Sequence, residues 1–339
     1  MYKIIGGDRK EYGPVSAEDL RRWIAEGRLN AQSSIQSEGS AEWKPLSTFP
    51  EFADLLEAQV GQAPPAGASP PPINPALWSA EILARQPQLD VGGCLSRSWN
   101  LLQANFGLLF GATLLVWLFG LLGIAGQFLV PIAGVLPALA LGSITGLVYW
   151  ILHGVFLGGL SLVFLNRIRG QPATVGGAFQ GFHGGFAQLL LAGVVSSLLS
   201  TIGVCFCLVP GIYLLVAWRF SVPLVADKGL EFWSAMELSR KVVTRVWFPV
   251  LGMMLVAFLP FILTYIFAEL KMITLHPSTM RGGPPDFAQI FDSLGQTMTA
   301  SLPYVLLIKF VLLLNLPFGL GALMYAYEDL FGPRPAPGA

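Results

Sequence analysis

The sequence contains little charge and almost no cysteine. Only 12% of its 339 residues are Asp, Glu, Lys or Arg, about half of the ~25% typical of soluble domains, while 54% are hydrophobic and the mean hydropathy is +0.62. This balance excludes a disordered chain and an ordinary soluble enzyme. The 3 cysteines, Cys94, Cys205 and Cys207, are too few for a disulfide framework. The composition therefore indicates a membrane protein.

The sequence also lacks the motifs of the common catalytic and metal sites. It has no H-E-x-x-H, no G-x-S-x-G, no P-loop and no cysteine–histidine spacing suited to a metal. We therefore predict a protein that is not an enzyme and that uses no cofactor, no metal and no nucleic-acid partner.

Charge is distributed unevenly along the chain. The first 59 residues hold 7 Lys and Arg and 10 Asp and Glu, against 13 and 10 in the remainder. They begin without the basic end and apolar core of a signal peptide, so we expect them to stay in the cytoplasm. The predicted parts are a cytoplasmic domain at 1–58, a proline-rich linker at 59–88, a transmembrane domain at 89–331 and a cytoplasmic tail at 332–339.

Long uncharged stretches predict six transmembrane helices. Residues 98–166 contain no Asp, Glu, Lys or Arg. At ~1.5 Å per residue, one helix of that length would cross a ~30 Å hydrocarbon core more than twice. Prolines and glycines divide the apolar stretches into spans near 106–129, 138–164, 187–206, 209–226, 246–268 and 304–327. The sequence does not fix the division between the third and fourth spans.

Amphipathic segments group these spans into hairpins. Before the first span, apolar residues recur at helical spacing: Val91, Leu95, Trp99, Leu102 and Phe106. Similar segments stand near 178–182 and from residue 238. The predicted fold class is thus a small α+β domain followed by an all-α polytopic membrane domain, with six transmembrane helices arranged as three hairpins with interfacial helices.

Basic residues predict the orientation. One side of the predicted bundle collects Arg85, Arg97, Arg167, Arg169, Lys228, Arg240, Lys241, Arg245 and Arg334, and the other side has only Lys271 and Arg281. Basic loops face the cytoplasm, so both termini are expected there, in a bacterial inner membrane. The acids Asp227, Glu231 and Glu237 lie among the bases, which predicts a solvated charge cluster rather than an acid–base pair.

Two ionisable residues inside predicted spans are candidates for function, because charge is costly in hydrocarbon. His153 either takes part in a proton or substrate relay or stays neutral and hydrogen-bonded to a neighbouring helix. Lys309 stands one or two turns from the outer end of the sixth span. Its stem can therefore also extend to the membrane surface.

The first 57 residues predict a compact α+β unit. Strands at 2–5 and 11–15 pair as a hairpin, and Ser16-Ala-Glu-Asp19 has the form of a capping box that opens a helix. A further strand is expected at about 33–37, and a short helix after Pro50.

Residue spacing in this unit resembles the GYF domain signature. Gly13-Pro14-Val15 is followed at the same intervals by Leu20, Trp23 and Gly27-Arg28-Leu29, and Gly39-x-x-x-Trp43-x-Pro45-Leu46 is similar to the bacterial GYF-2 type. Eukaryotic GYF domains hold proline-rich peptides in an aromatic groove, which suits a polyproline helix because it is already extended. The resemblance covers about residues 1–57 and implies a protein-interaction module.

The aromatic groove is only partly present. Non-aromatic residues, Val15, Arg28 and Leu29, stand where the resemblance implies aromatic ones. The peptide-binding candidates are Tyr12, Gly13, Pro14, Trp23 and Trp43. Trp23 lies on the apolar face of its predicted helix, so its alternative role is in the core.

The linker is rich in proline. Six prolines stand between residues 60 and 75, which predicts a semi-rigid spacer. The alternative is that Pro70-Pro71-Pro72 is a tethered ligand for the chain's own N-terminal domain, where a high effective concentration would help a weak site.

The membrane domain carries a looser resemblance. Pro210–Val225 and Leu323–Leu330 are similar to parts of the six-helix membrane domain attached to some bacterial glycerophosphodiester phosphodiesterases. The likeness covers about 90–331. The sequence has no room for their hydrolase barrel of about 250 residues. The resemblance therefore implies architecture and not that activity.

Three functions fit these features. The leading hypothesis is a non-enzymatic integral inner-membrane protein whose GYF-like module binds a proline-rich or other protein partner, while the bundle anchors it or handles lipid. The alternatives are a transporter or channel-like protein for a small solute, or the membrane subunit of a lipid-processing system. A transporter would need His153 or Lys309 for flux.

Overall fold

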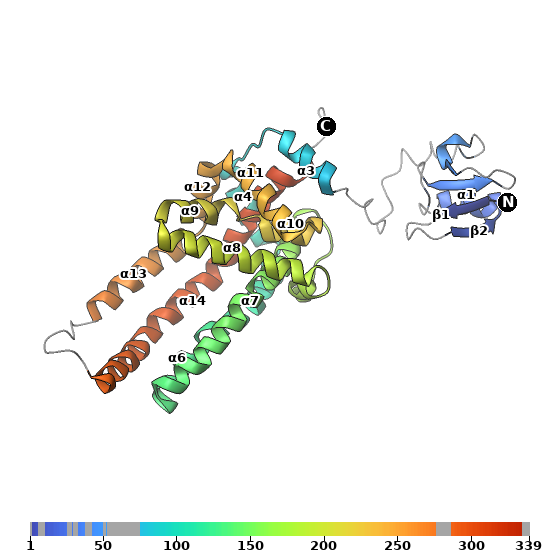
Figure 1. The fold of residues 1–339 in the computed structure, drawn as a ribbon. Helices are drawn as coiled ribbons and strands as arrows, with labels where there is room; N and C mark the ends of the chain where they lie inside the picture. Colours follow the sequence, from blue (N-terminus) through green and yellow to red (C-terminus); the bar gives the residue numbers. More distant parts are fainter. Residues whose placement is uncertain are drawn as a thin grey trace. The chain divides into compact units, whose positions relative to one another are not determined.

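The computed structural model describes residues 2–5, 11–25, 29, 33–37, 43–49, 52, 75–275 and 286–333. The chain separates into two compact units, Met1–Ile73 and Asn74–Ala339 (Figure 1). The first is a small α+β unit and the second is helical, which confirms the predicted fold class. Pro70-Pro71-Pro72 and the motif residues Gly27 and Arg28 lie outside the described residues.

The N-terminal unit is built on a four-stranded antiparallel sheet. β1 (Tyr2–Ile5) pairs with β2 (Glu11–Val15) on one side and with β3 (Ser34–Ser37) on the other. β3 also pairs with β4 (Lys44–Pro45), so the strand order is β2-β1-β3-β4. Helix α1 (Ala17–Ala25) follows β2, and a 3-10 turn, η1 (Leu46–Thr48), follows β4. These elements confirm the predicted hairpin, helix and third strand.

Helix α1 begins where the capping box predicts. The backbone N–H of Asp19 donates to Ser16 Oγ at 3.1 Å, and that hydroxyl donates to the Asp19 carboxylate at 2.8 Å. These bonds satisfy a free N–H group of the first turn. The helix and sheet then bury one apolar cluster: Ile4, Leu20, Ile24, Leu29, Ile35, Leu46 and Phe52.

The second unit is a succession of helices with short breaks. Apolar segments form helices here because a helix satisfies the hydrogen bonds of its backbone without water. Their bounds are α3 (Pro75–Ala84), α4 (Val91–Ala104), α5 (Phe106–Gly120), η3 (Leu121–Ile124), α6 (Ala125–Ala133), α7 (Val135–Ile168), η4 (Val175–Phe182), α8 (Phe186–Phe206), α9 (Leu208–Ala217), α10 (Ser221–Lys228), α11 (Phe232–Thr244), α12 (Trp247–Ala257), α13 (Leu259–Leu275) and α14 (Phe287–Phe331).

The described residues contain 5 helices, or helices joined end to end, that are long and apolar enough to cross a membrane. They are 106–133, 135–168, 186–206, 208–228 and 287–331. Helices α12 and α13 make a sixth span if they are counted together, although they are bent by 69° at their junction. The division between the third and fourth spans falls at Cys207, between α8 and α9. This chain therefore has the apolar helices of a multi-pass membrane protein.

The last helix is longer than the sequence predicts. The expected span at 304–327 is the second half of α14, which runs for 45 residues from Phe287. Asp286 caps it, because its carboxylate accepts the backbone N–H of Gln289 at 2.7 Å. Pro303 and Pro317 both lie inside the helix without ending it.

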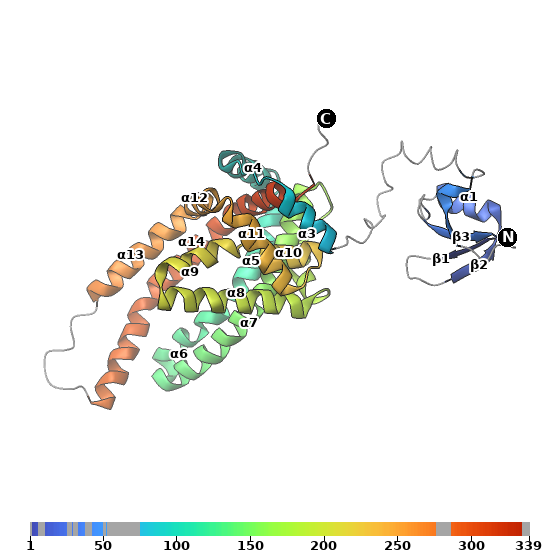
Figure 2. The same ribbon diagram turned by 45° about the horizontal axis from the view of Figure 1, so that its top comes forward.

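The three segments expected to precede the hairpins are α4, η4 and α11. α4 and α11 gather with α3, α10 and the end of α14 at one end of the unit, from which α7, α13 and the rest of α14 extend (Figures 1 and 2). Arg85 in this group donates to the carbonyl of Gly332 at 2.9 Å. The first and last helices of the unit therefore meet at that end.

Helices α7 and α8 pack unusually closely at one point. Gly154 faces Gly193, and a Cβ placed on Gly193 would lie 2.6 Å from the Cα of Gly154. Such an approach is possible only because both residues lack a side chain. The crossing joins the first predicted hairpin to the second.

Candidate functional site

The sheet separates the peptide-binding candidates of the N-terminal unit into two groups. Gly13 and Pro14 are exposed on β2, at one edge of the sheet, while Trp43 directly precedes β4, at the opposite edge. Three strand intervals of ~4.8 Å place the two edges ~14 Å apart. The side chain of Tyr12 lies outside what the structure describes. Among the described residues, Gly13 and Pro14 therefore lie at the edge of the sheet opposite to Trp43.

The two tryptophans have different environments. Trp23 packs against the buried cluster of the unit, which supports its alternative role in the core. Trp43 is half-buried and does not belong to that cluster. An extended polyproline segment rises ~3.1 Å per residue, so about five residues would reach from Pro14 to Trp43.

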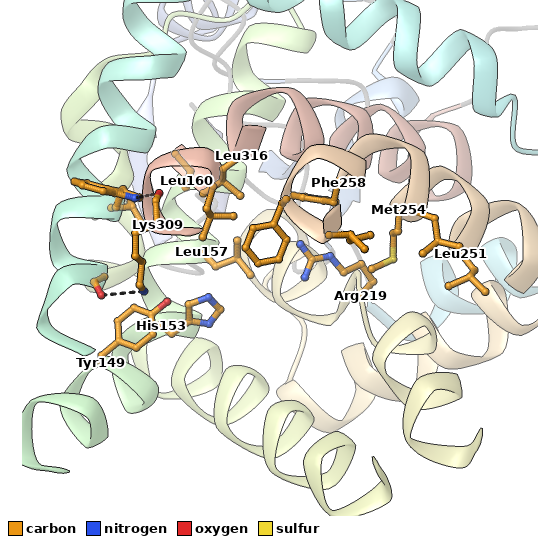
Figure 3. Close-up of a pocket in the computed structure, with 17 residues that line it drawn as sticks. Tyr149, His153, Leu157, Leu160, Arg219, Leu251, Met254, Phe258, Lys309 and Leu316 are labelled. Carbon is orange, nitrogen blue, oxygen red and sulfur yellow. Dashed lines mark hydrogen bonds between the residues drawn. The ribbon is translucent and has the colours of Figure 1, made fainter. Parts of the chain in front are cut away.

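A cavity of about 390 Å³ lies inside the helical unit (Figure 3). We call it the central cavity, because all three hairpins contribute to its wall. α5 and α7 supply one side, α12, α13 and α14 supply another, and Arg219 comes from the break between α9 and α10. Most of the wall is apolar: Val116, Leu157, Leu160, Leu251, Met254, Leu255, Phe258, Phe261, Ile262, Leu312 and Leu316.

The cavity brings together His153 and Lys309, the two ionisable residues that the sequence singles out. Lys309 Nζ donates to the carbonyl of Gly120 at 3.3 Å and lies 5.6 Å from the centre of the Tyr149 ring. The ammonium therefore borders the cavity, and its extension to the membrane surface stays a prediction. Trp117 Nε1 donates to the backbone carbonyl of Lys309 at 2.6 Å and fixes α5 against α14.

His153 has one aromatic neighbour and borders open space. Its ring meets the Tyr149 ring edge-on, with centres 5.6 Å apart. Within the described ranges, no hydrogen bond links its imidazole to a neighbouring helix, so that part of the prediction is wrong. The side chain is exposed and lines the cavity.

The third basic residue of the cavity, Arg219, is missed by the sequence analysis. It is half-buried, and its side chain extends toward the part of the cavity where His153 and Lys309 lie (Figure 3). No hydrogen bond or ion pair holds its guanidinium among the residues that the structure describes. Arg219 lies inside the predicted span 209–226, so the rule that selected His153 and Lys309 also applies to it.

A second polar group closes the end of the unit where α4 and α11 gather. Arg169 forms a two-pronged ion pair with Asp227, with Nη2 2.9 Å from Oδ2, and it also contacts Glu328 at 2.6 Å. The hydroxyl of Tyr327, which is fully buried, donates to Asp227 at 2.8 Å. Only 6% of the Asp227 side chain is exposed. The predicted solvated cluster is therefore wrong for Asp227, because three helices pack their charged ends against one another.

Other charges at this end remain on the surface. Glu237 accepts from Arg240 at 2.8 Å and lies 3.3 Å from Lys241. The hydrogen bond from Arg240, supported by Lys241, lowers the pKa of Glu237 to about 2. The group is therefore a carboxylate at any physiological pH. Within the described part of the chain, no cluster of three or more His, Cys, Asp or Glu could hold a metal ion.

Comparison with known families identifies the N-terminal unit. Residues 2–52 match the family model of GYF domain 2. No curated protein and no solved structure matches the chain. The N-terminal unit is therefore similar to GYF domain 2, and the helical unit has helices long and apolar enough to span a membrane. The likeness of residues 90–331 to the membrane domain of phosphodiesterases stays a prediction.

Proposed function

We propose that this protein is a non-enzymatic bacterial inner-membrane protein whose N-terminal domain recruits a protein partner to the cytoplasmic face of the membrane. The observation that carries the proposal is the occurrence, in one chain, of the GYF domain 2 match at residues 2–52 and of helices long and apolar enough to span a membrane. A small module suits binding, and the helices suit anchoring.

The contact surface that we propose runs from Gly13-Pro14 to Trp43. Residues on both edges of the sheet are exposed, and Trp43 is not part of the buried apolar cluster. A proline-rich segment in polyproline II form loses little conformational entropy on binding and presents a ridge that stacks on indole. The alternative ligand, Pro70-Pro71-Pro72 of the same chain, would compete for this surface.

Partner recruitment is tested by cross-linking in native membranes. The full chain, a chain without residues 1–58 and the variant Trp43→Ala are compared. A specific protein should co-purify with the full chain, disappear with the deletion and weaken with Trp43→Ala. Trp233→Ala is the matched control, because Trp233 is 55% exposed on α11 of the other unit. A partner set that is the same for all four chains would contradict recruitment.

Proline recognition is tested separately, by titrating a decaproline peptide into the full chain in detergent. Trp43→Ala should weaken binding roughly tenfold, which corresponds to ~1.4 kcal/mol. Equal binding of a Gly-Ser peptide of the same length would remove the proline preference, although recruitment by another sequence would stand.

A transporter is the second candidate, because the central cavity gathers residues from three hairpins around His153 and Lys309. It predicts that His153→Ala or Lys309→Ala abolishes flux of a solute at normal expression. Unchanged flux in both variants would remove this candidate.

A further inference from the structure

The central cavity combines basic residues with an apolar wall, and recruitment of a partner by the N-terminal unit does not require either feature. Its polar residues include three nitrogen bases, His153, Arg219 and Lys309, and none of the described residues that line it is Asp or Glu. Most of the remaining wall consists of aliphatic and aromatic side chains. The cavity is therefore complementary to a molecule with a negative group at one end and an apolar body.

Arg219 makes this complementarity specific. Its break between α9 and α10 lies within an apolar segment, Leu208–Lys228, that is long enough to cross the membrane. A guanidinium without a partner among the described residues is costly in such surroundings, which favours a counter-ion that arrives with a ligand. Guanidinium groups pair with carboxylate or phosphate through two parallel hydrogen bonds.

The other two bases line the same cavity. The Lys309 ammonium has one backbone carbonyl and one ring face as neighbours, which leaves donor capacity for a further acceptor. The imidazole of His153 borders the same space and can donate from either nitrogen when protonated. In Figure 3 the Arg219 side chain enters the cavity from the side of Phe258, while Lys309 lies on the other side, beside Tyr149 and His153.

The size and wall of the cavity define the rest of the ligand. Its volume of about 390 Å³ lies within the ~300–1,000 Å³ range of small-molecule sites. Leu255, on the wall, is 48% exposed at the surface of the unit, so the cavity reaches the face that hydrocarbon would cover. A chain that starts at the bases can therefore leave between the helices.

We propose that the central cavity binds an anionic amphiphile, with its carboxylate or phosphate held by Arg219 and its acyl chain along the apolar wall. The site is independent of the recruitment function, which belongs to the N-terminal unit. Arg219 acts as the counter-ion, and Lys309 adds a second positive charge to the same cavity.

The test is native mass spectrometry of the full chain purified in a non-ionic detergent. Four probes are added in separate samples: oleate, dioleoyl phosphatidic acid, dioleoyl phosphatidylcholine and inorganic phosphate. We expect the wild-type chain to retain one equivalent of oleate or of phosphatidic acid, and neither phosphatidylcholine nor free phosphate. Retention of oleate alone identifies a carboxylate site, and retention of phosphatidic acid alone identifies a phosphate site.

The variants locate the bound anion. Arg219→Gln should weaken retention of the anionic probe roughly tenfold or more, since a charge-assisted hydrogen-bonded pair is lost. Lys241→Gln is the matched control: Lys241 is a cation with 47% of its side chain exposed, outside the cavity, and the variant should bind as the wild type does. Lys309→Met should give a smaller loss.

Three results would overturn the proposal. One is retention of phosphatidylcholine as strong as that of the anionic probes, which needs no variant and so does not depend on the folding of Arg219→Gln. Another is unchanged retention of the anionic probe in Arg219→Gln. The last is saturation by inorganic phosphate alone, which would make the site a free-anion site without a role for the apolar wall.

Discussion

The hydroxyl of Tyr327 should contribute measurably to the stability of the helical unit. It donates at 2.8 Å to an Asp227 carboxylate that also receives Arg169, and the whole side chain of Tyr327 is buried. Tyr327→Phe removes this bond and keeps the ring. A hydrogen bond to a charged group contributes ~1.5–3 kcal/mol. Asp227 retains Arg169 and also Lys228 at 3.0 Å, so we expect a loss near the lower value, ~1.5 kcal/mol.

The assay is the free energy of unfolding in mixed micelles titrated with dodecyl sulfate. Tyr325→Phe is the matched control on the same helix. The Arg97 guanidinium lies 4.7 Å from the centre of the Tyr325 ring, and phenylalanine preserves that contact, so the change should stay below ~0.5 kcal/mol. A double-mutant cycle between Tyr327→Phe and Asp227→Asn should show coupling of ~1 kcal/mol. Equal losses in the two tyrosine variants, or no coupling, would refute the role assigned to this bond.

Three further predictions concern packing and protonation. Gly193→Ala should destabilise the unit by ~1–3 kcal/mol, because the new Cβ would lie 2.6 Å from the Cα of Gly154. Gly252→Ala should be tolerated, because no neighbouring atom lies within 4 Å of the position of its Cβ. Equal unfolding midpoints for the two variants would contradict the close crossing. Burial, with the nearby Asp329 carboxylate, raises the pKa of Cys94 to about 12, so only ~10⁻⁴ of this thiol is thiolate at pH 8. In a variant with Cys205 and Cys207 changed to serine, iodoacetamide should therefore label Cys94 far more slowly than it labels free cysteine. The pKa of Glu237 is lowered from 4.5 to about 2, so its contribution to the free energy of unfolding should be constant above pH 4.5 and vanish as the pH falls toward 2. If the difference in free energy of unfolding between wild type and Glu237→Gln already disappears at pH 4, the ion pairing is refuted.

Local patterns in the sequence predict much of this fold. The capping box at Ser16 fixes the start of α1, and the apolar stretches predict the spans because a backbone in hydrocarbon must form helix. Cys207 marks a division that hydrophobicity alone leaves open, since the residues on both sides are apolar. The bend between α12 and α13 is likewise absent from the pattern, because both helices are apolar throughout.

The functional groups are predicted less completely, because they depend on contacts distant in sequence. His153 and Lys309 follow from the cost of charge in a membrane, and Arg219 follows from the same rule but stands at the end of an uncharged stretch, where it resembles a boundary. Nothing local indicates that Arg169 pairs with Asp227, 58 residues away. The separation of Pro14 from Trp43 depends on the strand order, which spacing does not encode.

The central claim, recruitment of a partner by the N-terminal domain, is tested most directly by site-specific photo-cross-linking in native membranes. A photoreactive phenylalanine analogue replaces Trp43 in one chain and Trp233 of α11 in another. The account predicts a discrete cross-linked protein from position 43 and none from position 233. Excess decaproline, or the partner's own segment, should reduce the cross-link from position 43. Identical cross-linking patterns from both positions, or none from position 43, would contradict it.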